Sequence, residues 1–237
     1  MAHRPRIAIL GRFAESTSVT RYAAIVTAKR LAEFVWESGG EPLTLLPVAN
    51  SNWAERLHGI DGVLMPGGSD VDPQWYGEEP ASDEIYGVDP LQDEVDLSLV
   101  RYVLDAGIPL FTVCRGTQIT NVALGGSLHQ HVNDPHLYHV DEVTIHRDHD
   151  VLGLSAPTVT ASCYHHQAIN RLGDGVTPIA HSVHGHHIEA VTFASAGWAA
   201  GVQWHPEDNF DTDPAQLEIG RRFISEAIRY RATQSPT

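Results

Sequence analysis

The chain has 237 residues, of which 42% are apolar and 19% are charged, a composition typical of a globular protein. Fifteen lysines and arginines against 30 aspartates and glutamates give a formal net charge of −15, which disfavours nucleic-acid and anionic-membrane partners. Two cysteines cannot form a disulfide framework and no apolar run suits a membrane span, so we expect one cytoplasmic domain over residues 1–237 with a flexible tail from about residue 232.

The first half of the chain alternates short apolar runs with segments of helical periodicity. Apolar runs that end at turn residues predict buried strands, at 6–10, 43–46, 62–65 and 108–113. Apolar residues at helical spacing predict helices over 21–38, 53–57, 92–106 and 115–124. The acidic, Gly- and Pro-containing segment 70–90 is expected to be a surface loop.

After His129 the predicted elements are mainly short strands, some of them linked as hairpins. They lie at 143–145, 158–161, 176–179, 188–192 and 199–204, and an amphipathic helix over 213–230 follows. The order of elements predicts an α/β fold, a doubly wound and mostly parallel sheet flanked by helices, with a small additional β-hairpin region.

Cys114 stands where a buried strand is expected to pass into a helix, with Gly116 two positions later. This pattern is typical of a nucleophile elbow, in which a tight strand-to-helix turn lifts the side chain above the sheet. The positive end of the helix dipole favours a thiolate at this position. The alternative is a buried structural cysteine.

His205 and Glu207 follow the last predicted strand, in the segment Gly201–Glu207 (GVQWHPE). Parallel strands present functional side chains at their carboxyl ends, so we expect His205 beside Cys114, with the Glu207 carboxylate orienting the imidazole. The alternative is a surface histidine and an unrelated glutamate.

Gly67 and Gly68 follow the third predicted strand and let the backbone approach a ligand. With the N–H of Arg115, the glycine backbone could form an oxyanion hole. A plain strand-to-loop turn is the alternative.

These motifs occur in an order that covers nearly the whole chain. The matching segments are Glu37–Pro47, Pro66–Pro73, Tyr76–Glu78, Cys114–Gln118, Asn121–Leu128, His165–Ile169, Ile188–Ala190 and Gly201–Glu207. In them the chain resembles the class I glutamine amidotransferase-like family, which has a flavodoxin-like fold, and within it the gamma-glutamyl-gamma-aminobutyrate hydrolase group.

The resemblance implies a role for each matching residue. Cys114 would be the nucleophile, His205 the base and acid, and Glu207 the third member of the triad. The N–H groups of Gly68 and Arg115 would form the oxyanion hole. Two substrate-binding residues are implied as well, Gln118 and His165.

The chain also departs from the family pattern. Thr112 stands where a Gly or Ala is usual, and Gln92 stands where an Arg commonly precedes Asp93. Ser162-Cys163 and His184-Gly185 replace Asn-Ser and Asp-Gly in the half that we expect to bind substrate. The chemistry is therefore better specified than the substrate.

Fifteen histidines raise the possibility of a metal site. Closely spaced histidines could share an ion, and the candidates are His129, His131, His136, His139, His146, His149, His184, His186 and His187. No complete metal-binding signature is present, so we expect no metal and no other cofactor, and we interpret Cys163 as structural.

We therefore expect a hydrolase that cleaves a small γ-glutamyl amide, such as γ-glutamyl-γ-aminobutyrate, through a thioester. Three alternatives are a glutaminase subunit that supplies ammonia to a separate synthetase, a non-catalytic binding protein on the same fold, and a metal hydrolase. The expected partner is the small-molecule substrate, with a homodimer as a further possibility. Because the substrate is anionic, we expect local positive groups, Arg115 among the candidates, to offset the negative charge at the pocket.

Overall fold

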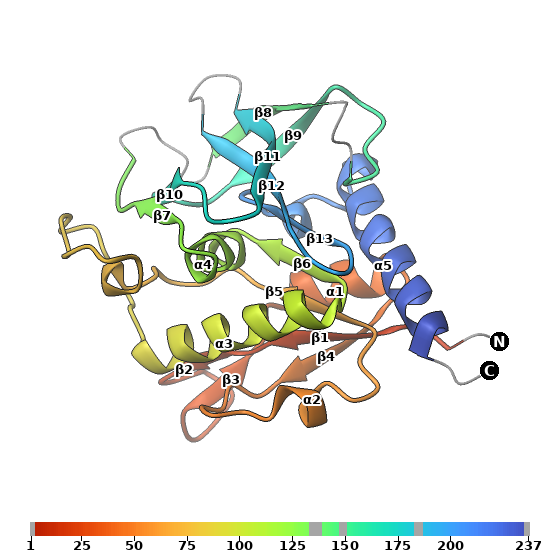
Figure 1. The fold of residues 1–237 in the computed structure, drawn as a ribbon, viewed down its shortest axis with the longest axis horizontal. Coiled ribbons are helices and arrows are strands. Elements are labelled where there is room, and N and C mark those ends of the chain that lie inside the picture. Colours follow the sequence, from red (N-terminus) through yellow and green to blue (C-terminus); the bar gives the residue numbers. More distant parts are fainter. Residues whose placement is uncertain (1–2, 133–138, 147–150, 183–186, 235–237) are drawn as a thin grey trace.

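The computed structural model describes residues 3–132, 139–146, 151–182 and 187–234. A nine-stranded sheet crosses the molecule in the order β4-β1-β5-β6-β13-β12-β11-β8-β9 (Figure 1). The first five strands of this order are mutually parallel, and they are β1 (Arg6–Leu10), β4 (Glu41–Leu45), β5 (Gly62–Met65), β6 (Leu110–Val113) and β13 (Ala199–Val202).

The other four strands extend the sheet with antiparallel pairings. They are β8 (His139–Ile145), β9 (Thr158–Cys163), β11 (Val176–Ser182) and β12 (Ile188–Phe193). Two small hairpin-like sheets lie beside the main one, β2 (Arg12–Ala14) with β3 (Ala24–Val26) and β7 (Ser127–His129) with β10 (Ala168–Arg171). The expected additional β region is therefore larger than one hairpin and continuous with the central sheet.

Helices cover both faces of the parallel strands, as a doubly wound sheet requires. Along β1, Ile7 and Ile9 pack with α1 (Lys29–Glu37) and α5 (Pro214–Gln234) on one face. Ala8 and Leu10 pack with α3 (Pro90–Ala106) and α4 (Arg115–Ala123) on the other. Two buried cores therefore hold the sheet, and its carboxyl edge is left for other contacts.

The remaining helical turns are short. They are α2 (Trp53–Arg56), η1 (Pro73–Tyr76) inside the expected loop 70–90, and η3 (Pro206–Asp208) after β13. Within the described part of the chain, no helix combines the length and apolarity needed to cross a membrane.

Among the expected boundaries, those of the first and last helices are wrong. The helix expected over 21–38 begins only at Lys29, because the β-branched residues before it pair as β3 with β2. The closing helix continues past residue 230 to Gln234, so the first residues of the expected tail are helical. Arg231 donates a hydrogen bond to the His3 carbonyl oxygen (2.9 Å), which ties this last turn to the start of the chain.

Candidate active site

Cys114 lies between β6 and α4, in the strand-to-helix turn that the sequence predicted. Its backbone has φ 51° and ψ −112°, a conformation that costs energy for a residue with a side chain. The turn depends on Gly116, where an added Cβ would lie 2.3 Å from the Met65 carbonyl oxygen. The glycine therefore lets the elbow pack against the end of β5.

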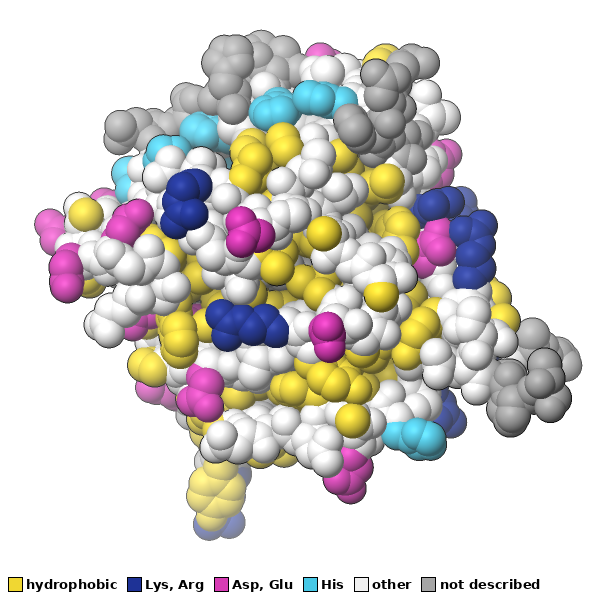
Figure 2. Space-filling model, in the orientation of Figure 1, with side chains coloured by type: hydrophobic (Ala, Val, Ile, Leu, Met, Phe, Trp, Pro, Cys, Tyr) yellow, Lys and Arg dark blue, Asp and Glu magenta, His cyan; other side chains and the backbone are white. Residues whose placement is uncertain are grey.

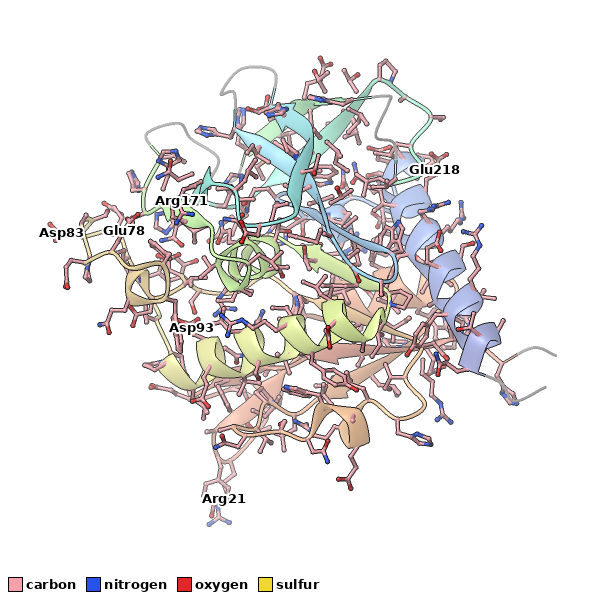
Figure 3. The ribbon with its side chains drawn as sticks, viewed as in Figure 1. Arg21, Glu78, Asp83, Asp93, Arg171 and Glu218 are labelled. Atoms are coloured by element: carbon pink, nitrogen blue, oxygen red, sulfur yellow. The ribbon has the colours of Figure 1, made fainter. Side chains whose placement is uncertain are left out.

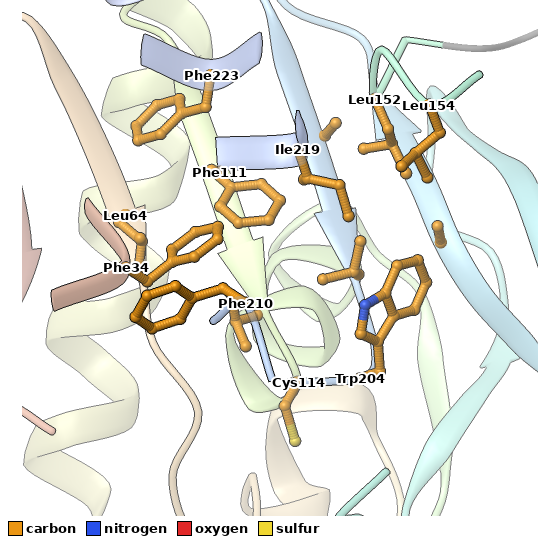
Figure 4. Close-up of a cluster of buried hydrophobic side chains, with 14 of the residues drawn as sticks. Phe34, Leu64, Phe111, Cys114, Leu152, Leu154, Trp204, Phe210, Ile219 and Phe223 are labelled. Carbon is orange, nitrogen blue, oxygen red and sulfur yellow. The ribbon is translucent and has the colours of Figure 1, made fainter. Parts of the chain in front are cut away.

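The Cys114 side chain stands at the edge of a buried apolar cluster, with its sulfur turned away from Phe111 and Trp204 (Figure 4). The Cys114 N–H donates to the Val202 carbonyl oxygen (2.8 Å), which joins the ends of β6 and β13. Cys114 is only 5% exposed. The thiol is thus held at the carboxyl edge of the sheet and shielded from bulk water.

His205 stands three residues beyond β13, beside Cys114. Its Nδ1 lies 2.8 Å from Glu207 Oε1, as the sequence predicted. An added Cβ on Gly67 would lie 2.9 Å from His205 Cε1 and 3.7 Å from Cys114 Cβ. These close approaches place the imidazole, the thiol and the Gly67 backbone around one point.

The charge on His205 is set by its neighbours. Burial opposes protonation of the imidazole, but Glu207 and Cys114 outweigh it and hold the pKa of His205 well above its usual value. A protonated imidazole that is paired with a carboxylate can deliver a proton to a leaving group.

The Glu207 turn is fixed from outside by α1. Arg30 donates through Nε to the Glu207 carbonyl oxygen (3.1 Å) and through Nη2 to the Asp208 carbonyl oxygen (3.0 Å). His205 N–H donates to the Ser162 carbonyl oxygen (2.8 Å), which anchors the same segment to the end of β9.

Gly68 and Arg115 supply the two backbone N–H groups expected to form the oxyanion hole. Neither N–H donates a hydrogen bond within the described part of the chain. Gly68 lies against the residues that surround the elbow, because a Cβ added there would lie 3.0 Å from Arg115 Cδ. The geometry is therefore compatible with the expected hole.

The Arg115 side chain does not offset charge at the pocket, contrary to expectation. It is 3% exposed and forms ion pairs with Asp93 and Asp96 of α3. Figure 3 labels Asp93 on the side of α3 that faces α4. Arg12, the first residue of β2, lines the pocket instead, but its guanidinium also pairs with Asp96. The sequence did not reveal Arg12, because its place after a strand is the only local signal that it carries.

A hollow of about 280 Å³ opens beside His205 and Glu207, with Arg12, Val26 and Leu31 among its walls. A larger hollow, of about 600 Å³, lies at the opposite edge of the sheet near Arg6 and Tyr230. None of the site residues predicted from the sequence lines the larger one, so the smaller hollow is the one next to the chemistry.

Gln118 and His165 are both buried near the triad. Gln118 donates through Nε2 to the Gln167 carbonyl oxygen (2.9 Å) and to Gln203 Oε1 (3.3 Å). His165 Nδ1 lies 2.9 Å from the Gln167 carbonyl oxygen. The two side chains are thus held through Gln167, and their contact with substrate stays a prediction.

The substitutions relative to the family pattern have local partners. Thr112 Oγ1 lies 2.8 Å from Thr117 Oγ1, and Gly201 opposite leaves room for both hydroxyls. Gln92 donates through Nε2 to Asp96 Oδ1 (2.8 Å), and the same Asp96 carboxylate pairs with Arg115. Ser162 donates through Oγ to Asp208 Oδ2 (2.8 Å), next to Glu207.

The described residues contain one group of three side chains with metal-ligand chemistry, and it differs from the candidate histidine pairs. It comprises Cys163, His165 and Glu189, whose ligand atoms lie within 4.8 Å of one another. Burial, with the charges of Glu189 and Asp141, raises the pKa of Cys163 strongly, so its thiol is neutral at neutral pH. Burial likewise raises the pKa of Glu189.

On the face shown in Figure 2, several histidine side chains gather at the end of the molecule formed by the antiparallel strands. His131 Nδ1 lies 3.2 Å from His166 Nδ1, and His146 Nε2 lies 3.0 Å from His181 Nδ1. His129 lies in β7, His139 begins β8 and His187 precedes β12. Four of the candidate histidines lie outside the described residues, namely His136, His149, His184 and His186.

Comparison with known proteins places this site in a family. The family model described as peptidase C26 matches residues 5–207. A protein of Mycobacterium tuberculosis that is classed with the glutamine amidotransferases is 36% identical over 194 residues, which cover 76% of this chain and 59% of that protein. The gamma-glutamyl-gamma-aminobutyrate hydrolase PuuD of Escherichia coli K12 is 31% identical over 193 residues, covering 73% of this chain and 74% of PuuD.

The fold has a counterpart among solved structures. A protein of Thermoplasma acidophilum described as a GMP synthase subunit superposes with a TM-score of 0.69 over 99% of both chains, at 18% identity. This likeness shows the fold, and the matched family model and relatives show the family. The chain belongs to the peptidase C26 family, whose members are class I glutamine amidotransferase-like proteins.

Proposed function

We propose that the protein hydrolyses the γ-glutamyl amide bond of small γ-glutamyl compounds, such as γ-glutamyl-γ-aminobutyrate, and releases glutamate and an amine. The observation that carries this proposal is His205, which is paired with Glu207 through Nδ1 and stands beside Cys114 at the strained elbow. This is the arrangement that an acyl transfer through a cysteine requires.

The reaction would proceed in two halves. The Cys114 thiolate attacks the γ-carbonyl carbon, and the N–H groups of Gly68 and Arg115 stabilise the oxyanion of the tetrahedral intermediate. His205 gives its proton to the amine nitrogen as the carbon–nitrogen bond breaks, which leaves a thioester on Cys114. His205 then takes a proton from water, whose oxygen attacks the thioester and releases glutamate. Glu207 stabilises the imidazolium throughout.

The direct test is glutamate release from a panel of γ-glutamyl amides that differ only in the leaving amine. We expect turnover by the native protein and none by the Cys114→Ala variant, with an unchanged melting temperature. The matched control is Cys163→Ala, which removes the other thiol of the chain. Normal turnover by Cys114→Ala would contradict the proposal.

A glutaminase subunit that serves a separate synthetase is the second candidate, because relatives are classed with the glutamine amidotransferases. The acyl half of both reactions is the same, so the two candidates differ in the leaving group and the partner. Glutamine hydrolysis that requires an added synthetase would favour this second function. Hydrolysis of larger γ-glutamyl amides by the purified protein alone would favour the first.

A further inference from the structure

Four charged side chains, three of them buried and one partly buried, lie directly beneath the Pro66–Gly68 turn. They are Arg12, Asp93, Asp96 and Arg115, which we call the Arg12–Asp96 network. Asp96 is 0% exposed and accepts hydrogen bonds from Arg12 Nη1 (2.8 Å), from Arg115 Nη1 and from Gln92 Nε2 (2.8 Å). Two guanidinium groups and two carboxylates balance one another, so the network can exist in the interior.

Arg12 uses its remaining donors on the backbone of the turn. Nε donates to the Gly67 carbonyl oxygen (2.9 Å), and Nη2 donates to the Pro66 carbonyl oxygen (2.6 Å). The described chain has no cis peptide bond, so the C=O and N–H of each peptide unit point in opposite directions. Arg12 therefore holds the Gly67 oxygen on its own side and turns the Gly68 N–H to the other side.

Asp96 links this arrangement to the second expected oxyanion donor. Asp96 bonds Arg12, which holds the peptide that carries the Gly68 N–H. Asp96 also bonds the side chain of Arg115, the first residue of α4, whose backbone N–H is the second expected donor. One buried carboxylate thus connects both halves of the expected hole.

From these contacts we propose that Arg12, held by Asp96, is a positioning residue that orients the Gly68 N–H toward the oxyanion. The proposal rests on the function proposed above for Gly68 and Arg115. Lysine presents its three N–H donors from a single nitrogen, whereas Arg12 reaches Asp96 and the two backbone oxygens from three different nitrogens of its planar fork. The absence of a side chain at Gly68 permits the approach, because a Cβ there would lie 3.1 Å from Arg12 Nε.

The test separates oxyanion stabilisation from thiol reactivity. Acylation of Cys114 by p-nitrophenyl acetate passes through an oxyanion, whereas its alkylation by iodoacetamide does not. In the Arg12→Lys variant, which keeps the charge beside Asp96, we expect the acylation rate to fall by about 10-fold to 100-fold. The expected loss is smaller than that for removal of an oxyanion donor, because the Gly68 N–H is misdirected but still present. Alkylation should stay within about twofold, because the same thiolate reacts.

Arg56→Lys is the matched control, since Arg56 also donates to a side chain and to a backbone carbonyl oxygen, but far from Cys114. We expect both of its rates to be unchanged. Arg12→Ala with added guanidinium ion should recover part of the acylation rate, because the ion can bond Asp96 and the carbonyl oxygens. If Arg12→Ala does not fold, Arg12→Lys alone decides the question.

The proposal is overturned if Arg12→Lys acylates at the native rate, or if acylation and alkylation fall together. Neither reagent is a γ-glutamyl compound, so the result does not depend on the substrate. A native protein that releases no glutamate, combined with a selective loss of acylation in Arg12→Lys, would remove the proposed function and leave the positioning role intact.

Discussion

His205 and Glu207 form a hydrogen-bonded pair, with 2.8 Å between Nδ1 and Oε1, although only Pro206 separates them in the chain. The turn of η3 brings the two side chains together, and Arg30 holds the Glu207 backbone from α1. Because the carboxylate faces Nδ1, the other ring nitrogen, Nε2, is left for the Cys114 side. The pair therefore has the orientation that proton transfer at Cys114 needs.

Glu207→Gln should shift the pH dependence of turnover. In the native protein Glu207 and Cys114 outweigh burial and raise the pKa of His205, so the imidazolium keeps its proton well above the usual range for histidine. Without the carboxylate His205 loses its proton at lower pH, so the basic limb of the kcat/KM profile should move to lower pH. We also expect about 100-fold lower kcat.

Asp208→Asn is the control for this variant. It removes a neighbouring negative charge that accepts a hydrogen bond from Ser162 Oγ, at 2.8 Å, and it leaves the His205 bond in place. Its profile should overlie the native one. A basic limb that does not move in Glu207→Gln would show that Glu207 has no control over the imidazole.

Gly67→Ala should reduce activity by moving His205. The added Cβ would lie 2.9 Å from His205 Cε1, so the ring must leave its present place beside the thiol. Because His205 is partly exposed, the shift should cost little stability while kcat/KM falls about 100-fold, as for a misplaced catalytic group. Steady-state kinetics and thermal unfolding of the same preparation measure the two effects. Native kinetics would mean that the imidazole is not confined as the structure indicates.

The sequence predicts that Cys114, His205 and Glu207 lie together, because each comes after a buried apolar strand and strand ends can be recognised in a single sequence. The structure places them side by side, and their catalytic roles stay a prediction. The sequence did not reveal Arg12, Asp93 or Asp96 as one network, because their contacts join β2, α3 and α4 across the fold. The sign of a charge is visible in the sequence, but its partner is not. For that reason the sequence points to Arg115 as a pocket cation, whereas its guanidinium is buried with aspartates.

The predicted start of α1 is wrong for a different reason. Ala24, Ile25 and Ala28 fit helical spacing, yet the segment 24–26 is extended and pairs with β2. Local periodicity cannot distinguish a helix from a strand here, because the extended conformation depends on a contact with a residue outside the segment. That residue is Gly11, where an added Cβ would lie 2.2 Å from Ile25 Cγ2.

Iodoacetamide should label Cys114 and leave Cys163 unmodified in the native protein. Burial raises the pKa of Cys163, so its thiol stays protonated, and it is 1% exposed. Cys114 lies beside His205, whose pKa is raised, and a thiol beside an imidazolium is the more reactive kind. Peptide mass spectrometry after limited labelling should find one modified site, and denatured protein should show two. Labelling of Cys163 at a similar rate would contradict this difference between the two thiols.

The chain also offers a comparison between a buried and an exposed ion pair. Arg115 and Asp93 have side chains that are 3% and 0% exposed, whereas those of Lys29 and Glu33 are 88% and 40% exposed. Asp93→Asn leaves two guanidinium groups facing the single carboxylate of Asp96, so we expect the free energy of unfolding to fall by about 3 kcal/mol. Glu33→Gln should change it by about 0.5 kcal/mol or less, because water screens the exposed pair. Urea denaturation measures both values, and equal effects would mean that the buried network contributes no more to stability than a surface contact.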